Sequence, residues 1–493
     1  MDPRRHRLPA LEQALADPPS VPDVRERSDL AGLARRTVRP IDLIGHSVAV
    51  VAPSASALVS PYLMLRVVGP GAWLSALIGF GLAFLLASVF SQFATRMAAP
   101  GSMYTWVTRA LGPGCGLLIA ASMLLGYATL VAFGVSQSVR HGAEAGTSAG
   151  WGTPSVPAQL ALAVAIVLVC VAIAVRGVGM STRVALAAEV TLVLSLGVLV
   201  ILTIAREGLA LDGILSLEGA SPTRILLGAS FIMSITVGFE SSAALAAEVE
   251  RPFLSVPRSL FGTVAISAVL YALAYVAMHA VLADDGPMPG PAQRWFPPNV
   301  DVHVADAVLS GLLCLGFLTL ALCALNALAR VLFSLAREGL LPGWLGRTHP
   351  RWLSPYGALV AVAPLAVLPA VVATVSGTGI GSITVRLLGA AVLVLAIAYA
   401  LVALAVPVFL VRLQEETWRP VVVALAAAGL AGTVSALDVV EDLRHGQWLA
   451  CALACLTLVV GAGWYAWLRL RRPAVLRRMG IHDETIASDL LHR

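Results

Sequence analysis

The chain has 493 residues, of which 58% are hydrophobic and 12% are charged. It is too apolar for a water-soluble globule, because a large share of any globule's surface faces water. The formal net charge is +5 and all 33 basic residues are Arg, but they lie in short loops and tails rather than along one face, which argues against a nucleic-acid-binding protein.

The N-terminal residues are polar and rich in Pro and Arg, without the apolar core that marks a signal peptide. We expect residues 1–40 to form a flexible cytoplasmic tail and residues 469–493 to form a second cytoplasmic tail. The region between them, 41–468, is predicted to be a transmembrane transporter domain. It contains twelve apolar segments long enough to cross a hydrocarbon core of about 30 Å, at residues 41–63, 71–94, 114–139, 158–175, 184–204, 224–247, 259–282, 304–334, 356–376, 383–411, 420–438 and 448–468. The predicted fold class is an all-α polytopic membrane protein with about twelve transmembrane helices.

The distribution of Arg predicts how these spans are oriented. With the N-terminus in the cytoplasm, 26 arginines lie in the inside loops and tails. The other 7 lie in outside loops or nearby span ends, at Arg66, Arg140, Arg206, Arg224, Arg294, Arg386 and Arg444. Such an excess follows the positive-inside rule. We therefore expect a multi-pass protein of the cell (cytoplasmic) membrane with both termini inside.

The first and sixth segments are each interrupted near their centre. The interruptions read Ala-Pro-Ser-Ala-Ser-Ala at 52–57 and Val-Gly-Phe-Glu-Ser-Ser at 237–242. Each opens a group of five spans, 1–5 and 6–10, and two extra helices come after them. Groups of odd length would lie in the membrane with opposite orientation, and matching broken helices in two inverted halves indicate a transporter's binding site. The sequence thus predicts two inverted five-helix repeats with discontinuous helices 1 and 6.

The interruption in the first segment is a candidate substrate site. Pro53 removes a backbone donor and disrupts the helix, while Ser54 and Ser56 are able to bond the freed carbonyls. A second half-helix is then expected to begin near Ala55 to Ala57, where free N–H groups would attract a substrate carboxylate. The alternative is a simple proline kink that contacts no ligand.

Glu240 is the most informative residue of the sixth segment. A charged side chain near the centre of a span costs about 2.5–3.5 kcal/mol on insertion scales, which predicts a protein-lined or wet cavity around it. Glu240 is therefore a candidate for proton coupling; alternatively, its carboxyl group only stabilises the unwound backbone. Gly238 supplies backbone freedom or allows close helix packing. The candidate substrate contacts here are Val237, Gly238, Phe239 and Ser241, of which Phe239 either closes over a substrate or is a lipid-facing or core side chain.

Other polar residues inside the spans are weaker candidates. Glu189 in the fifth segment is a second candidate for proton coupling, and Tyr127 and Asn326 are candidate substrate contacts. His46 and Tyr399 are further polar residues inside the predicted spans that are weaker candidates for a role in the site. For each of these residues the competing role is structural, as a bond to another helix or a packed ring. The six Cys form no CxxC pair and have no His at metal-ligand spacing, so we expect neither a metal nor a cofactor.

Three stretches of the chain resemble the amino-acid–polyamine–organocation (APC) permease superfamily. They are GSMYTWVTRALGPGCG from Gly101 to Gly116, GFESSAALAAEVERPFLSVPR from Gly238 to Arg258, and NALARVLFSLAREGLLPGWLGRTHPRWLSP from Asn326 to Pro355. With the spacing of the spans, the resemblance covers about residues 38–470. It implies two inverted five-helix repeats, alternating access and a substrate held between unwound parts of spans one and six. It also places Phe239 at the gate-like aromatic position and Glu240 at the acidic position next to it.

Two features depart from the family pattern. The Gly-Ser-Gly-like stretch that receives the substrate carboxylate in the family is Pro-Ser-Ala-Ser-Ala at 53–57 in this chain. Some family members carry a Lys in span five where others bind sodium, whereas this chain has no Lys and has Glu189 in that span. Charged residues of the cytoplasmic motifs either form inner-gate ion pairs or only fix topology and contact lipid phosphates; they are Arg109, Glu248, Arg258, Arg330 and Arg337.

We predict a secondary active transporter of an amino acid or related amine, either proton-coupled or an exchanger, with the solute and membrane lipids as its partners. The alternative is an exporter or exchanger of a polyamine, an amino-acid derivative or another organic cation. The chain has no phosphate-binding GxxxxGK[ST] loop, which argues against ATP-driven pumping. It has neither an HExxH nor a GxSxG motif, which argues against an intramembrane enzyme such as a lipid or prenyl transferase. Short tails without a signalling domain disfavour a non-transporting nutrient sensor.

Overall fold

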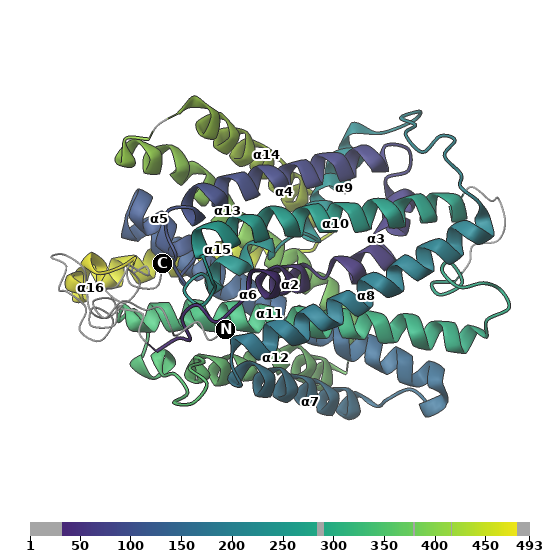
Figure 1. Cartoon of the computed structure of the whole chain (residues 1–493), viewed down its shortest axis with the longest axis horizontal. Coiled ribbons are helices and arrows are strands. Elements are labelled where there is room, and N and C mark those ends of the chain that lie inside the picture. Colours follow the sequence, from purple (N-terminus) through teal and green to yellow (C-terminus); the bar gives the residue numbers. More distant parts are fainter. Residues whose placement is uncertain (1–31, 283–289, 378–379, 416, 481–493) are drawn as a thin grey trace, which may run out of the picture.

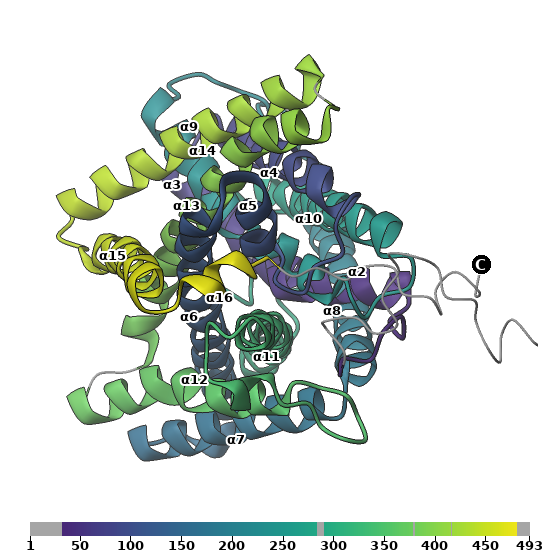
Figure 2. The same ribbon diagram turned by 90° about the vertical axis from the view of Figure 1, so that its left-hand side faces the viewer.

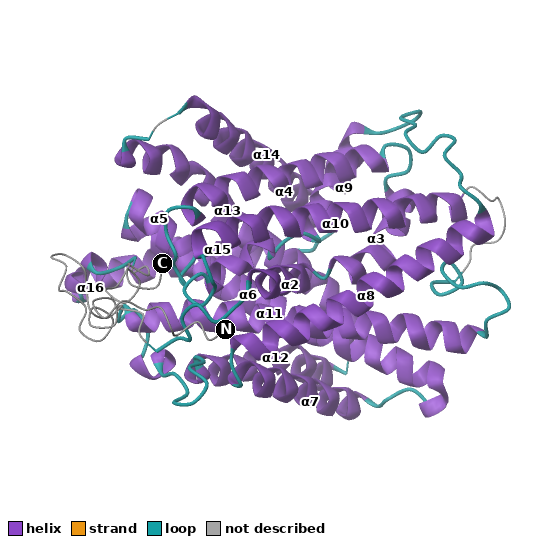
Figure 3. Cartoon of the chain, in the orientation of Figure 1, coloured by secondary structure: helices purple, strands orange, loops and turns teal. Residues whose placement is uncertain are grey.

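The computed structural model describes residues 32–282, 290–377, 380–415 and 417–480. Most of the predicted N-terminal tail and the end of the predicted C-terminal tail lie outside the described residues. Within those ranges the named secondary-structure elements are all helices, joined by loops and turns (Figure 3). An isolated parallel bridge joins Val38 to Val249.

The twelve predicted spans are confirmed: the described residues contain 12 helical segments long and apolar enough to cross a membrane. The first six are built by α2 (Pro40–Val51) with α3 (Pro53–Val67), α4 (Ala72–Ala94), α6 (Pro113–Gly146), α7 (Val156–Val175), α8 (Val178–Glu207), and α9 (Pro222–Ser234) with the 3₁₀ helix η3 (Phe239–Leu245). The second six are α10 (Pro252–Leu282), α11 (Val302–Arg337), α12 (Tyr356–Ser376), α13 (Ile380–Leu413), α14 (Trp418–Arg444) and α15 (Leu449–Arg471). Short helices connect them or lie beyond the last one: α5 (Met103–Leu111), η2 (Thr147–Trp151), η4 (Gly343–Gly346) and α16 (Pro473–Arg477).

Proline residues fix where several of these helices begin. Pro40, Pro113 and Pro222 stand in the first turn of α2, α6 and α9. Proline is favoured at this position because its φ is already helical and the N–H that it lacks would have no intrahelical partner. At the other end of a span, Gly377 terminates α12 in the left-handed conformation, a common helix stop.

The helices run side by side along the long axis of the molecule, and α5 and α16 lie together at one end (Figure 1). We call this end the α16 face and the opposite end the far face. Figure 2 looks onto the α16 face and shows α6 and α11 near the centre of the bundle, with α14 and α15 at its edge. Burial agrees with this arrangement, because the apolar windows of spans one and three are 78% buried and those of α14 and α15 are 22% buried.

Span one breaks at a single residue. Ala52 separates α2 from α3 with φ 47° and ψ 53°, in the left-handed region. The predicted interruption over 52–57 is therefore too long, and the second half-helix begins at Pro53 rather than near Ala55. Pro53 is suited to the first helical position, and the Ser56 N–H already donates to the Ala52 carbonyl at 3.0 Å. The break leaves the N–H groups of the first turn of α3 without intrahelical partners.

Span six is interrupted over a longer stretch. The helix α9 ends at Ser234, a turn runs through Gly238, and η3 continues as a 3₁₀ rather than an α-helix. Gly238 has φ 98°, and a Cβ atom at this position would lie 2.5 Å from Val50 Cγ1. Both the backbone conformation and the close approach of α2 therefore require glycine, which satisfies both predicted roles of this residue.

Replacing Gly238 by Ala should destabilise the protein by about 1–3 kcal/mol, the usual cost of holding a non-glycine residue in left-handed backbone. The measurement is the midpoint of thermal unfolding of the purified protein. Gly262→Ala is the matched control, because Gly262 lies within α10 and a Cβ there would meet no atom within 4 Å. Equal unfolding temperatures for the two variants would show that the turn does not depend on glycine.

Candidate functional site

The two helix breaks lie against each other in the centre of the bundle. Ser47, one turn before the end of α2, donates its hydroxyl to the Phe239 carbonyl at 2.6 Å. On the same side Val50 packs against the turn at Gly238. Two segments nearly 200 residues apart in sequence are thus held together at the point where each loses its regular helical bonds.

Four helix ends surround this point. The first turns of α3 and η3 present N–H groups, and the last turns of α2 and α9 present carbonyl groups. Helix N-termini carry partial positive charge and C-termini partial negative charge. The site therefore offers a donor end and an acceptor end within one small region, which suits a solute that carries both charges.

Glu240 is fully buried beside the second break and binds two phenol groups. Tyr127 from α6 donates its hydroxyl to Oε1 at 2.8 Å, and Tyr399 from α13 donates to Oε2 at 2.5 Å. The Tyr399 oxygen also accepts the Gly238 N–H at 3.2 Å. Both carboxyl oxygens of Glu240 therefore have a hydrogen-bond partner. The arrangement also ties the turn of span six to spans three and ten.

The other residues predicted around the second break are packed in this conformation. Phe239 stacks on Phe90 with ring centroids 5.5 Å apart and meets Tyr399 edge-on at 6.1 Å. The hydroxyl of Ser241 and both ring nitrogens of His46 are buried without a hydrogen-bond partner. Buried polar atoms without partners are rare in proteins and call for an explanation.

Glu189 lies on α8 beside the first break and is 4% exposed. Ser54, the second residue of α3, donates its hydroxyl to Oε1 at 2.6 Å. The second oxygen, Oε2, is buried and has no hydrogen-bond partner. The carboxyl group of Glu189 thus faces the N-terminal turn of the half-helix that was predicted to receive a carboxylate.

A cavity of about 10 Å³ lies between the two breaks and the neighbouring spans. This volume holds no more than a water molecule, so an amino acid enters only after neighbouring helices move. Uncharged side chains line it: Pro53, Ser56, Ala57, Phe80, Ile235, Thr236, Ser267 and Tyr271. Of the predicted substrate contacts it includes three, all from α3, whereas Val237 lines a different cavity beside α14.

Asn326 belongs to a polar network nearer the α16 face. Its side-chain amide donates to Ser181 Oγ at 3.1 Å, and its Oδ1 accepts from Arg330 at 3.2 Å. Arg330 in turn forms a buried ion pair with Glu248, which lies just beyond η3. The Glu248 carbonyl accepts the N–H groups of Thr37 and Val38 at 2.7 and 3.0 Å. Segments from spans one, six and eight are therefore locked together on this side.

The remaining charged residues of the predicted inner gate have other partners or face outward. Arg109 donates to the Gly480 carbonyl at 2.9 Å, which holds the segment after α16 against α5. Arg337 lies over the Phe333 ring at 5.8 Å, and Arg258 is exposed. Of the five residues proposed for an ionic gate, Glu248 and Arg330 are the two that the structure pairs in the interior.

The far face is hollowed by a cavity of about 760 Å³. Charged groups of both signs line it, including Arg140 and Glu144 at the end of α6 and Asp306 in α11. Phe133 and Phe317 pack edge-on at 5.6 Å within the apolar cluster that also contains Ala52. The far face thus carries a large cavity, whereas on the α16 side the Glu248–Arg330 network ties the spans together.

Asp438 is a half-buried acidic residue at the edge of the bundle that the sequence did not reveal. The predicted eleventh span ended at this residue, but α14 continues to Arg444 and carries Asp438 into the bundle. There it accepts a hydrogen bond from Ser230 of α9. The sequence signal that could have identified Asp438 is an acidic residue that follows the apolar residues of α14 at helical spacing.

Twelve spans around two paired helix breaks define the chain as a polytopic membrane transporter. A family profile described as amino acid permease matches residues 42–463, and the chain belongs to this family. It is 25% identical over 425 residues to the branched-chain amino acid permease BcaP of Lactococcus lactis, covering 78% of this chain and 86% of that protein. These findings make the chain a membrane amino acid transporter rather than an enzyme.

Shorter and more distant similarities agree with this assignment. The chain is 30% identical over 132 residues to cationic amino acid transporter 6 (chloroplastic) of Arabidopsis thaliana, covering 27% of this chain and 23% of that protein. A point mutant of the manganese transporter of Eremococcus coleocola has a TM-score of 0.51 and 12% identity, covering 90% of this chain and 98% of that chain. At this identity the structural likeness shows the fold alone.

Glu248→Met should destabilise the protein by about 3–5 kcal/mol, because it leaves Arg330 charged, buried and without its carboxylate. The double variant Glu248→Met/Arg330→Met should recover most of this loss, since paired removal of a buried ion pair is often neutral. Thermal unfolding of the purified variants measures both effects. Arg258→Met, at an exposed residue of the same face, is the control and should change stability little. A double variant less stable than the single one would refute the pairing.

Proposed function

We propose that the chain is a secondary active transporter that moves a neutral amino acid across the cytoplasmic membrane by alternating access, with proton binding linked to substrate binding. The observation that carries the proposal is the position of the Glu189 carboxyl group on the first turn of α3. A buried acid there competes for the same helix end as a substrate carboxylate. The surroundings of both breaks and the two faces of the bundle support the other parts of the proposal.

The substrate backbone has a complementary partner at each break. The N–H groups of the first turn of α3, around Ser54 and Ala55, favour a carboxylate. The carbonyl groups at the ends of α2 and α9 favour an ammonium group. A zwitterionic α-amino acid satisfies both, whereas a polyamine offers no carboxylate for the α3 end.

The surroundings of the breaks favour an uncharged, apolar substrate side chain. The small cavity there is lined by Phe80, Ile235, Ala57 and other neutral residues. Binding sites for apolar groups are lined mainly by hydrophobic and aromatic side chains with a few polar groups that orient the ligand. The similarity to a protein described as a branched-chain amino acid permease points the same way. Leucine, isoleucine and valine are therefore the first substrates to test.

Glu189 supports the link between proton and substrate. Two carboxylates that share one site repel each other strongly, so one of them is held neutral by a proton. Glu189 has one oxygen bonded by Ser54 and one buried oxygen without a partner. When Glu189 is neutral, a substrate carboxylate binds the α3 end without this repulsion. Glu240 is the second proton-binding group in the proposal, since it holds the turn at the other break.

The two faces of the bundle support alternating access and an orientation. The buried Glu248–Arg330 pair ties the spans together on the α16 side, and the far face carries the large cavity. Because most arginines lie in loops and tails on the α16 side, the positive-inside rule assigns this face to the cytoplasm. Opening toward the cytoplasm then requires the Glu248–Arg330 pair to separate as the far cavity closes.

Uptake into liposomes tests the proposed transport. Purified protein in vesicles with an acidic exterior should accumulate radiolabelled leucine, isoleucine or valine, and the accumulation should collapse when a protonophore is added. Empty vesicles and a vesicle series without a pH gradient are the controls. Accumulation of a polyamine or another organic cation in place of these amino acids would overturn the proposed substrate class.

Glu189→Gln tests the linkage between proton and substrate. In the wild-type protein, leucine affinity should fall about tenfold between pH 5.5 and 7.5, a difference of about 1.4 kcal/mol. The Gln side chain is permanently neutral, so the variant should bind leucine with an affinity that does not change over this range. Asp306→Asn, which removes a charge from the far cavity, is the matched control and should keep the wild-type profile. An unchanged pH profile in Glu189→Gln would exclude this residue.

A further inference from the structure

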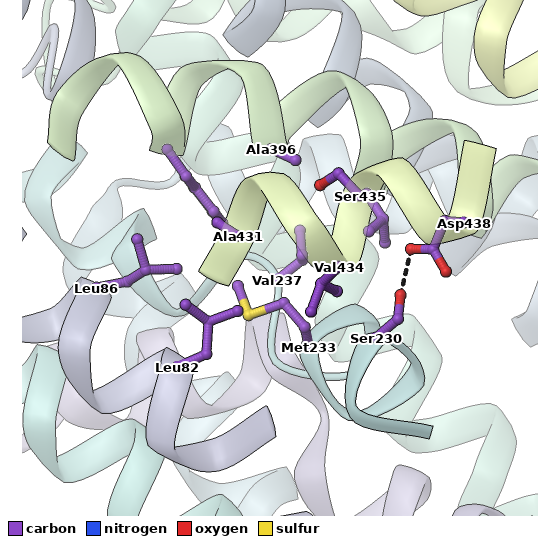
Figure 4. A pocket seen from close by; sticks show the side chains of 12 residues that line it. Leu82, Leu86, Ser230, Met233, Val237, Ala396, Ala431, Val434, Ser435 and Asp438 are labelled. Atoms are coloured by element: carbon purple, nitrogen blue, oxygen red, sulfur yellow. Dashed lines mark hydrogen bonds between the residues drawn. The ribbon is translucent and has the colours of Figure 1, made fainter. Parts of the chain in front are cut away.

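Asp438 is a carboxyl group in the eleventh span, at the edge of the bundle. It lies six residues before Arg444, the last residue of α14, which corresponds to about 9 Å along the helix. Ser230 of α9 donates its hydroxyl to the carboxylate (Figure 4). An acidic side chain at this depth is costly in a membrane and marks a functional position by default.

A cavity of about 20 Å³ joins this carboxyl group to the interior. Asp438, Ser435 and Ser230 supply polar groups at one side of it, as Figure 4 shows, and Leu82 and Leu86 of α4 lie at the other. A volume of this size accommodates one water molecule where polar partners are present. A water molecule in this cavity would therefore be able to carry a proton inward from Asp438.

Tyr399 lines the same cavity and is bonded to Glu240. Its hydroxyl donates to Glu240 Oε2 at 2.5 Å and accepts the Gly238 N–H at 3.2 Å. One lone pair of the Tyr399 oxygen remains for a donor on the cavity side. Because Glu240 is 0% exposed, a proton reaches it through one of its hydrogen-bond partners.

The groups that face Asp438 do not neutralise it. On its own helix, Glu441 and Asp442 lie three and four residues further on, toward the far face, and Asp442 acts on it electrostatically. From α4 the cavity receives leucines, from α9 it receives Ser230 and a methionine, and from α13 its titratable group is Tyr399. Further along α14, Glu441 pairs with Arg444 at 3.6 Å and contacts His445 at 3.5 Å, which leaves Asp442 to add to the negative potential that attracts protons to this end of the helix.

We propose that Asp438 takes up protons from the far side of the membrane and delivers them to Glu240 through the cavity and the Tyr399 hydroxyl. The inference rests on the proposed proton-coupled function. In the transfer, a proton binds the Asp438 carboxylate, moves to a water molecule in the cavity and binds the Tyr399 oxygen as the phenol proton passes to Glu240. Only O–H bonds form and break, Asp438 returns to its charged form, and no redox partner takes part.

The competing role of Asp438 is structural, as an acceptor that ties α14 to α9 through Ser230. Two variants separate the two roles. Asp438→Asn keeps an oxygen that accepts from Ser230 but binds no proton in this pH range. Ser230→Ala keeps the acid and removes the hydrogen bond. If Asp438 carries protons, Asp438→Asn impairs transport. If Asp438 is a structural tie, Ser230→Ala impairs it.

The experiment compares two kinds of leucine flux in proteoliposomes. One is uptake driven by an acidic exterior, and the other is exchange of labelled for unlabelled leucine at equal pH, which needs no net proton movement. Asp438→Asn should lower gradient-driven uptake at least tenfold and leave exchange within twofold of the wild type. Asp438→Glu should restore the driven flux, and Ser230→Ala should leave both fluxes within twofold. Asp442→Asn, one turn away on the same helix, is the matched control. It should lower gradient-driven uptake at most a few-fold.

Three results would overturn the inference in distinguishable ways. If the wild-type protein accumulates leucine with the proton gradient and Asp438→Asn does so equally well, the route through Asp438 is wrong and the proposed function stands. If Ser230→Ala and Asp438→Asn lower both fluxes together, Asp438 is a structural tie. If the wild-type protein shows no gradient-driven leucine uptake, the proposed function fails and the inference fails with it.

Discussion

The structure depends on a constraint that the bilayer imposes: a backbone amide or carbonyl in the hydrocarbon core must find its partner inside the protein. Continuous helices meet this requirement by themselves, but the breaks at Ala52 and Gly238 do not. The protein meets it by placing the breaks against each other, with Ser47 bound to the Phe239 carbonyl and Tyr399 bound to the Gly238 amide. The helix ends that remain are the groups available to a solute.

The same interactions connect the proposed binding region with the two acids that we propose bind protons. Glu240 is held by phenols from α6 and α13, and Glu189 faces the first turn of α3, so each break has its own acid. On the α16 side, the Glu248–Arg330 pair joins the end of span six to span eight. A change of charge at either acid would therefore act on segments that also carry the Glu248–Arg330 pair, which is the physical basis of the coupling that we propose between proton binding and conformation.

Features that arise from local pattern were predictable from the sequence, and features that depend on distant partners were not. Long apolar runs predicted every span, and a glycine beside an acid predicted the break at Gly238. The break in span one was predicted too long, because Pro53 initiates α3 as well as it interrupts a helix. That Tyr127 and Tyr399 share Glu240 was not predictable, since 113 and 159 residues separate them from it. The inverted repeat of spans 1–5 and 6–10 stays a prediction.

The central claim is that the first turn of α3 and the turn at Gly238 together hold the substrate. The most direct measurement is an experimental structure of the protein in lipid nanodiscs with bound leucine. The account predicts the leucine carboxylate within hydrogen-bond distance of the Ser54 and Ala55 amides and its ammonium group against the carbonyls at the ends of α2 and α9. Leucine bound elsewhere, with α3 and α9 unchanged around an empty centre, would contradict it.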